Sequence, residues 1–220
     1  MSFVTAIPTA IKVAGLLNDG YRFIKDHPEE VRGAVNEASK VVDAARRLVG
    51  NARDLVGADE AMSRVRAAAR GRDASSDACR AAAEKTVTRA RQAVLEAATL
   101  RMPLRKLVDR LGSSDDAVVQ KMMAALDAPG CFALATYRKL DLDRDLTDYK
   151  GIYVGGSPCV GEGIATAISR AGNPDVYADI KYGQNVQVYV FGCGEDELDV
   201  RSQALIEALG AAGSYNMPMA

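Results

Sequence analysis

The chain has 220 residues, of which 48% are hydrophobic, 26% are charged and 5% are aromatic, with no tryptophan. This composition is typical of a folded globular protein, and the Ala- and Arg-rich first half excludes an all-β fold. The apolar stretch Phe3–Leu17 contains Pro8 and Lys12. It is too short for a membrane span of about 20 residues and lacks the features of a signal peptide, so we expect a cytoplasmic protein.

The formal net charge of −1 conceals two halves of opposite sign. Residues 1–129 carry 21 basic and 17 acidic side chains, whereas residues 130–220 carry 7 and 12. The composition also changes at Pro129, from Ala- and Arg-rich to Gly-, Tyr- and Val-rich. We therefore predict an α+β protein with a helical domain over 1–128 and a smaller domain over 129–220.

Apolar residues in the first half recur every three or four positions, the spacing of one helix face. Val31, Val35, Val41, Val42 and Leu48 form such a stripe, and Pro28 and two acidic residues precede it. The spacing and the helix breakers predict an all-helical bundle or helical array. The predicted helices cover 3–25, 31–48, 58–69, 76–100, 104–111 and 113–129.

A basic segment runs from Arg64 to Arg91, with eight basic and three acidic residues and no aromatic ones. Two interpretations are open: solvated faces of amphipathic helices, or contacts to DNA phosphates. The candidate DNA-binding residues are Arg64, Arg66, Arg70, Arg72, Arg80, Arg89 and Arg91.

Four widely spaced cysteines and a single histidine limit the possible chemistry. Cys79, Cys131, Cys159 and Cys193 form no C-x-x-C pair, so we predict free thiols and no metal site. His27 would have to be the base of any Ser-His or Cys-His scheme, and its Asp26–Glu30 context indicates a helix start instead. We expect no cofactor.

The second half has the patterns of strands and helices in the order ββαβα. Runs of β-forming residues predict strands over 131–137, 151–155 and 186–191, and helical spacing covers 160–170 and 198–209. A polar loop, Lys139–Asp148, joins the first two strands. The result is a small three-stranded α/β domain.

This domain resembles the GIY-YIG nuclease superfamily, in particular a bacterial and phage subgroup. Gly130-Cys131-Phe132 is similar to the first motif, and Tyr153-Val154-Gly155 with Ser157 is similar to the second. The segment Gly172–Gly183 resembles the region after the first helix, and Leu205-Ile206 with Ser214-Tyr215-Asn216 resembles the end of the domain. The resemblance covers about the last 90 residues and implies structural roles for Gly130, Gly155 and Asn216.

The residues that the resemblance makes catalytic are mostly replaced. Phe132 stands where the family has a tyrosine, Gly163 where it has a phosphate-neutralising arginine, and Ser202 where it has a metal-binding glutamate. Tyr153 is the one catalytic residue retained. Glu162, Arg170, Arg201 and Glu207 are nearby in sequence, but a one-residue shift turns a helical side chain by about 100°.

Three functions follow from these observations. The first is a non-catalytic GIY-YIG-like module fused to helices that contact a partner protein or a second copy of the chain. The second is a divergent endonuclease that uses Tyr153 and Mg²⁺ or Mn²⁺. The third is DNA binding without cleavage, through the basic helices.

Overall fold

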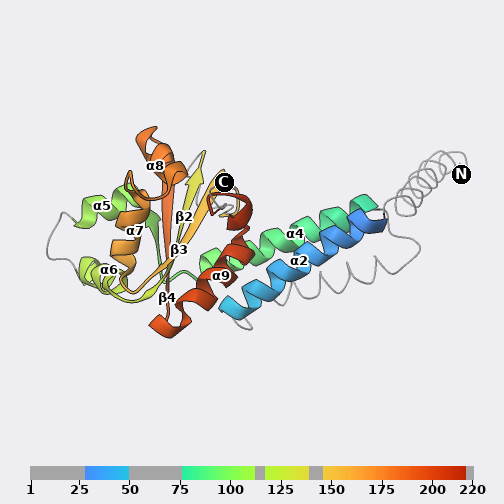
Figure 1. Ribbon diagram of the computed structural model, residues 1–220, viewed down its shortest axis with the longest axis horizontal. Coiled ribbons are helices and arrows are strands. Elements are labelled where there is room, and N and C mark those ends of the chain that lie inside the picture. The colour runs from blue at the N-terminus through green and yellow to red at the C-terminus, as the bar shows by residue number, and fades with distance from the viewer. Residues whose placement is uncertain (1–27, 50–75, 112–116, 139–145, 217–220) are drawn as a thin grey trace, which may run out of the picture. The chain divides into compact units, whose positions relative to one another are not determined.

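The computed structural model describes residues 28–49, 76–111, 117–138 and 146–216 (Figure 1). Within them the fold is mixed α/β and contains a four-stranded antiparallel sheet. The described residues divide into two compact units. The first holds residues 28–43 and 76–90, and the second holds 44–49, 91–111, 117–138 and 146–216.

The first unit contains most of two helices, α2 (Pro28–Val49) and α4 (Ser76–Glu96). Small and β-branched residues form its buried stripe: Ala38, Val41, Val42, Ala83 and Ala90. The buried Thr86 hydroxyl donates to the Ala82 carbonyl at 2.8 Å, which satisfies it inside the helix. The helix predicted over 31–48 is thus confirmed, and the one predicted over 76–100 is present but ends at Glu96. The helices predicted over 3–25 and 58–69 lie outside the described residues.

The sheet of the second unit has the strand order β1-β4-β2-β3. The strands are β1 (Leu100–Pro103), β2 (Gly130–Tyr137), β3 (Gly151–Ser157) and β4 (Asn185–Gly192). Three of them were predicted. The prediction omitted β1: it ended a helix at Leu100 and treated Met102-Pro103 as the break that follows. Pro103 is compatible with β1 because an edge strand leaves one row of N–H positions unpaired.

One face of the sheet, here called the α7 face, carries the main core. Phe132 and Leu134 of β2 and Val188 of β4 pack in one hydrophobic cluster with Val160 and Ile164 of α7. Four helices contribute to this cluster (Figure 1): α5 (Leu104–Leu111), α6 (Ala117–Asp127), α7 (Val160–Ile168) and α8 (Pro174–Lys181). The sequence predicted α5, α6 and α7 but not α8; residues 113–116 of the helix expected over 113–129 lie outside the described structure, and α6 ends at Asp127.

The opposite face, here called the α9 face, packs against α9 (Leu198–Leu209), which begins after a short turn of 3-10 helix at Glu195–Glu197. Leu205 and Leu209 of α9 are fully buried. Gly210, in the left-handed conformation at φ 68°, ends the helix at the boundary that the sequence predicted, and a second 3-10 turn at Ala211–Gly213 follows. None of the described helices is both long and apolar enough to cross a membrane.

Candidate functional site

The two motif strands lie side by side and bring Phe132 close to Tyr153. Phe132 of β2 pairs with Gly155 of β3, and Leu134 pairs with Tyr153. Because strand side chains alternate, these residues all lie on the α7 face. The Phe132 and Tyr153 ring centroids are 6.2 Å apart at an interplanar angle of 52°. Tyr153 is half-buried and packs against the core cluster.

The Phe132 ring fills the space between two glycines. It is only 2% exposed. A Cβ added at Gly155 would lie 2.6 Å from Phe132 Cζ, and one added at Gly163 would lie 2.7 Å from both Phe132 Cε1 and Ser157 Cβ. Gly163 therefore has no room for a methyl group in this packing, and still less for an arginine.

Ser202 does not join this group. It faces Cys131 at 3.3 Å between Oγ and Sγ, and a Cβ added at Gly156 would collide with its hydroxyl. Cys131 and Phe132 are adjacent on β2 and point to opposite faces of the sheet. The structure thus brings Phe132, Tyr153 and Gly163 together on the α7 face and places Ser202 on the α9 face.

The charged residues near these positions in sequence do not converge on Tyr153. Glu162 and Arg170 are exposed on and just after α7. Arg201 of α9 pairs at 3.2 Å with Glu197, the last residue of the 3-10 turn that precedes this helix. Glu207 accepts from Arg47 at 3.3 Å. Arg201 and Glu207 are thus each engaged in an ion pair within the second unit.

The predicted DNA-binding arginines are only partly within the described structure. Arg64, Arg66, Arg70 and Arg72 lie outside it, and Arg80 is described only as part of the α4 backbone. Arg89 is exposed. Arg91 is half-buried: its Nη2 lies where a Cβ at Gly210 would be, and its Nε is buried without a hydrogen-bond partner among the described residues. Arg91 is placed to complement the C-terminal end of α9.

The residues predicted to be structural have clear packing roles. Asn216 covers the free edge of β3: its Oδ1 accepts from Val154 N and its Nδ2 donates to Val154 O, both at 2.7 Å. A Cβ at Gly130 would lie 2.7 Å from the Phe191 carbonyl oxygen. The Asn216 side-chain amide therefore satisfies the backbone N–H and carbonyl of Val154 at the sheet edge.

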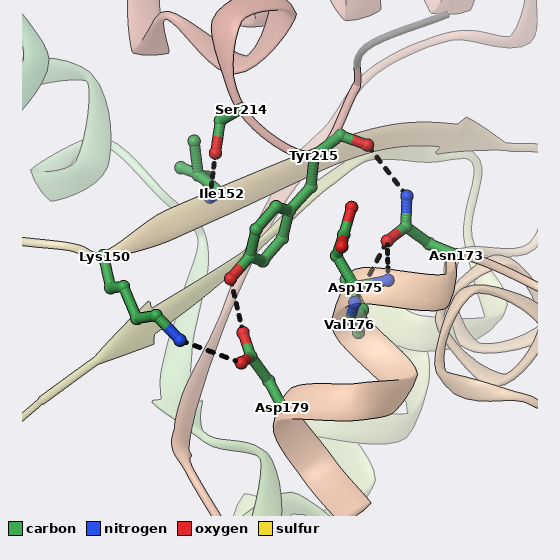
Figure 2. A network of polar contacts seen from close by, with 8 residues as sticks. All are labelled: Lys150, Ile152, Asn173, Asp175, Val176, Asp179, Ser214 and Tyr215. Carbon is green, nitrogen blue, oxygen red and sulfur yellow. Dashed lines mark hydrogen bonds and ion pairs between the residues drawn. The ribbon is translucent and has the colours of Figure 1, made fainter. Parts of the chain in front are cut away.

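A polar network beside this edge was not predicted from the sequence (Figure 2). The buried Asp179 carboxylate of α8 accepts from the Tyr215 hydroxyl at 2.6 Å and pairs with Lys150 Nζ at 3.5 Å. Asn173 caps α8 through its Oδ1, and its Nδ2 donates to the Tyr215 carbonyl at 2.8 Å. The network fastens the end of the domain to α8.

The electrostatics of this network favour a neutral Tyr215. Burial first, and then the hydrogen bond and negative charge of Asp179, raise the pKa of the Tyr215 hydroxyl above its usual value of 10. The Asn173-Pro174 pair is a helix-start signal that could have revealed α8 and the cap. No comparable signal in the sequence marks Asp179 as a buried carboxylate.

Metal ligation has no cluster to support it in this part of the chain. Among the residues described, no three His, Cys, Asp or Glu side chains are grouped so that they could hold a metal ion. Comparison of the whole sequence with protein-family models, and of the chain with curated proteins and solved structures, finds no significant match.

Proposed function

We propose that the domain predicted over 129–220 is a GIY-YIG-like module that does not catalyse phosphodiester hydrolysis, and that the protein acts in recognition or assembly through its helical region. The observation that carries the proposal is the Phe132 ring, buried between Gly155 and Gly163. By the resemblance, position 132 would hold the tyrosine of a catalytic site and position 163 its arginine.

Phosphodiester hydrolysis requires a base for water, a cation for the phosphate and, in this superfamily, a carboxylate for a divalent metal. Phe132 has no hydroxyl, and Gly163 lacks both the charge and the space for an arginine. Ser202 is bonded to Cys131 on the other face of the sheet. Phe132 is buried, Gly163 packs against its ring and Ser202 is hydrogen-bonded to Cys131, which favours loss of catalysis over relocation of the site.

The proposal is tested with the full chain, labelled duplex DNA and single-stranded DNA, at low salt with Mg²⁺ or Mn²⁺. We expect no cut products. The same gels reveal bound complexes, so DNA binding without cleavage would appear as a shifted band that weakens steeply with salt.

A matched variant makes the result decisive. Cleavage by the wild type that is lost in Tyr153→Phe would show a divergent nuclease and refute the proposal. A shifted band without cleavage would retain the non-catalytic module and identify its ligand as nucleic acid. With neither product nor shift, recognition of a protein partner is the form of the proposal that stands.

A further inference from the structure

Two cysteines meet where β2 begins and β4 ends, on the α9 face. Cys131 is completely buried, and Cys193, the first residue after β4, is half-buried. Gly130 pairs with Gly192, and the Cys193 N–H continues the ladder by donating to the Pro129 carbonyl at 3.3 Å. Cys131 and Cys193 are therefore diagonal neighbours on paired segments, and the Cys193 thiol is close enough to affect the ionisation of Cys131.

The two thiols have different environments. Cys131 donates to the Leu198 carbonyl at 3.7 Å and lies 3.3 Å from Ser202 Oγ, in the first turns of α9. Burial is the main reason that the pKa of the Cys131 thiol is raised to about 11. Since the thiolate is the reactive form, the raised pKa makes the Cys131 thiol less reactive. Cys193 is also the more exposed of the two, so it is the one that meets an oxidant first.

The backbone around Cys193 leaves room for the pair to close. Diagonal neighbours in an antiparallel pair have Cα atoms about 7–8 Å apart, slightly beyond the usual disulfide range of about 4.4–6.8 Å. Gly192 and Gly194 flank Cys193, and a Cβ added at Gly192 would meet nothing within 4 Å. A shift of about 1 Å in this glycine-flanked turn would bring the cysteines into range.

We propose that Cys131 and Cys193 form a modification site, at which a peroxide converts the two thiols into an intrachain disulfide. Hydrogen peroxide transfers one oxygen to Cys193, which becomes a sulfenic acid while one water leaves. The Cys131 sulfur then attacks the Cys193 sulfur, the S–S bond forms, and the sulfenic oxygen departs with the Cys131 proton as a second water. The two thiols are oxidised by two electrons and the peroxide is reduced.

The bridge would also change how α9 begins. Cys131 loses its proton on oxidation and can no longer donate to the Leu198 carbonyl. The disulfide would join β2 to the turn after β4 and release a contact with the first turn of α9. Oxidation is thereby linked to the helix that covers one face of the sheet.

The test counts free thiols in the full-length protein before and after treatment with hydrogen peroxide, with peptide mapping under non-reducing conditions. We expect the four thiols of the chain to fall to two, a single link between the Cys131 and Cys193 peptides, and recovery of four thiols with dithiothreitol. Cys193→Ser should form no link to Cys131. Cys159→Ser is the matched control, because the Cys159 thiol donates to the Leu126 carbonyl at 3.5 Å and is not part of the pair. This variant should form the Cys131–Cys193 link as the wild type does.

Four outcomes would overturn the proposal: no loss of thiols, a link through another cysteine, a bridge between two chains, or irreversible oxidation of Cys193 without a link. Peptide mapping of the wild type decides between these outcomes without any variant. The readout does not depend on nuclease activity, so it fails or succeeds separately from the proposed function.

Discussion

The Phe132 ring and Ser157 pack so closely against Gly163 that only a glycine fits at this position. We expect Gly163→Ala to destabilise the second unit by about 1–3 kcal/mol, because the added methyl must displace Phe132 or Ser157 from 2.7 Å contacts. Urea unfolding followed by circular dichroism measures the change. Gly192→Ala is the control: nothing lies within 4 Å of its added Cβ, and we expect a change within about 0.5 kcal/mol.

An unchanged midpoint in Gly163→Ala would show that the Phe132 ring moves easily. The argument that position 163 cannot accommodate an arginine would then fail. The comparison with Gly192→Ala separates this outcome from a general tolerance of alanine in the unit.

The single residue Tyr215 affects the pH dependence of stability. Its raised pKa means that the folded chain keeps the phenol proton to higher pH than the unfolded chain. The stabilisation is complete below pH 10 and is lost as the pH rises above 10, where the unfolded chain ionises first. Burial also raises the pKa values of Tyr149 and Tyr189, so the wild type should lose stability steeply in this range.

Tyr215→Phe isolates the contribution of this side chain. We expect the slope of unfolding free energy against pH above 10 to decrease by at most about 1.4 kcal/mol per pH unit, less where solvent screens the hydroxyl. At pH 7 the variant should be less stable by about 1–3 kcal/mol, because buried Asp179 loses its phenol donor. Urea titrations at pH 7 and at several values above 10 measure both effects, and an unaltered slope would contradict the assignment.

The edge strand β3 depends on the segment that follows α9. Ser214 Oγ accepts from Ile152 N at 3.0 Å, the Tyr215 N–H donates to the Ile152 carbonyl, and Asn216 satisfies Val154. Three consecutive residues thus cover a strand edge that would otherwise expose backbone groups.

We expect Asn216→Ala to lower stability by about 1–3 kcal/mol, since Val154 loses two 2.7 Å hydrogen bonds. Thermal unfolding by circular dichroism measures it. Gln203→Ala, on the exposed side of α9, should change stability by less than about 0.5 kcal/mol. Equal effects of the two substitutions would contradict a specific role for Asn216.

The elements that the sequence predicted well are those whose burial is one-sided or complete over a long stretch. α9 matches its predicted bounds because its buried leucines recur at helical spacing and Gly210 ends it. β1 was missed because four residues carry too short a pattern, and its pairing with β4 is set by distant contacts. α8 was missed because only two of its eight residues, Val176 and Asp179, are buried, which leaves no apolar pattern at helical spacing.

The candidate site was predictable as sequence positions and not as an arrangement. The resemblance located Phe132, Tyr153 and Gly163, which the structure does bring together, but it could not show that Ser202 lies on the other face. The role of Arg91 depends on α9, more than 100 residues later in the chain, so local charge patterning alone suggested a surface arginine.

At the scale of the whole molecule, the contacts of the sheet bear on where its domain begins. Leu104, Leu107, Met122 and Leu126 precede residue 129 and are buried in the same cluster as β2 and β4. A fragment of residues 129–220 would expose this side of the core, so we expect it to lack a cooperative unfolding transition. The full chain should show one in calorimetry, and cooperative unfolding of the fragment would place the boundary at residue 129.

The measurement that tests the central claim most directly is single-turnover cleavage, with the full chain in excess over end-labelled DNA and Mn²⁺ present. We predict that the amount of cut product equals that of the Tyr153→Phe variant and of a reaction without protein. Cleavage above this level that disappears in Tyr153→Phe would contradict the proposal, because it would show that the replacements at Phe132 and Gly163 do not abolish catalysis.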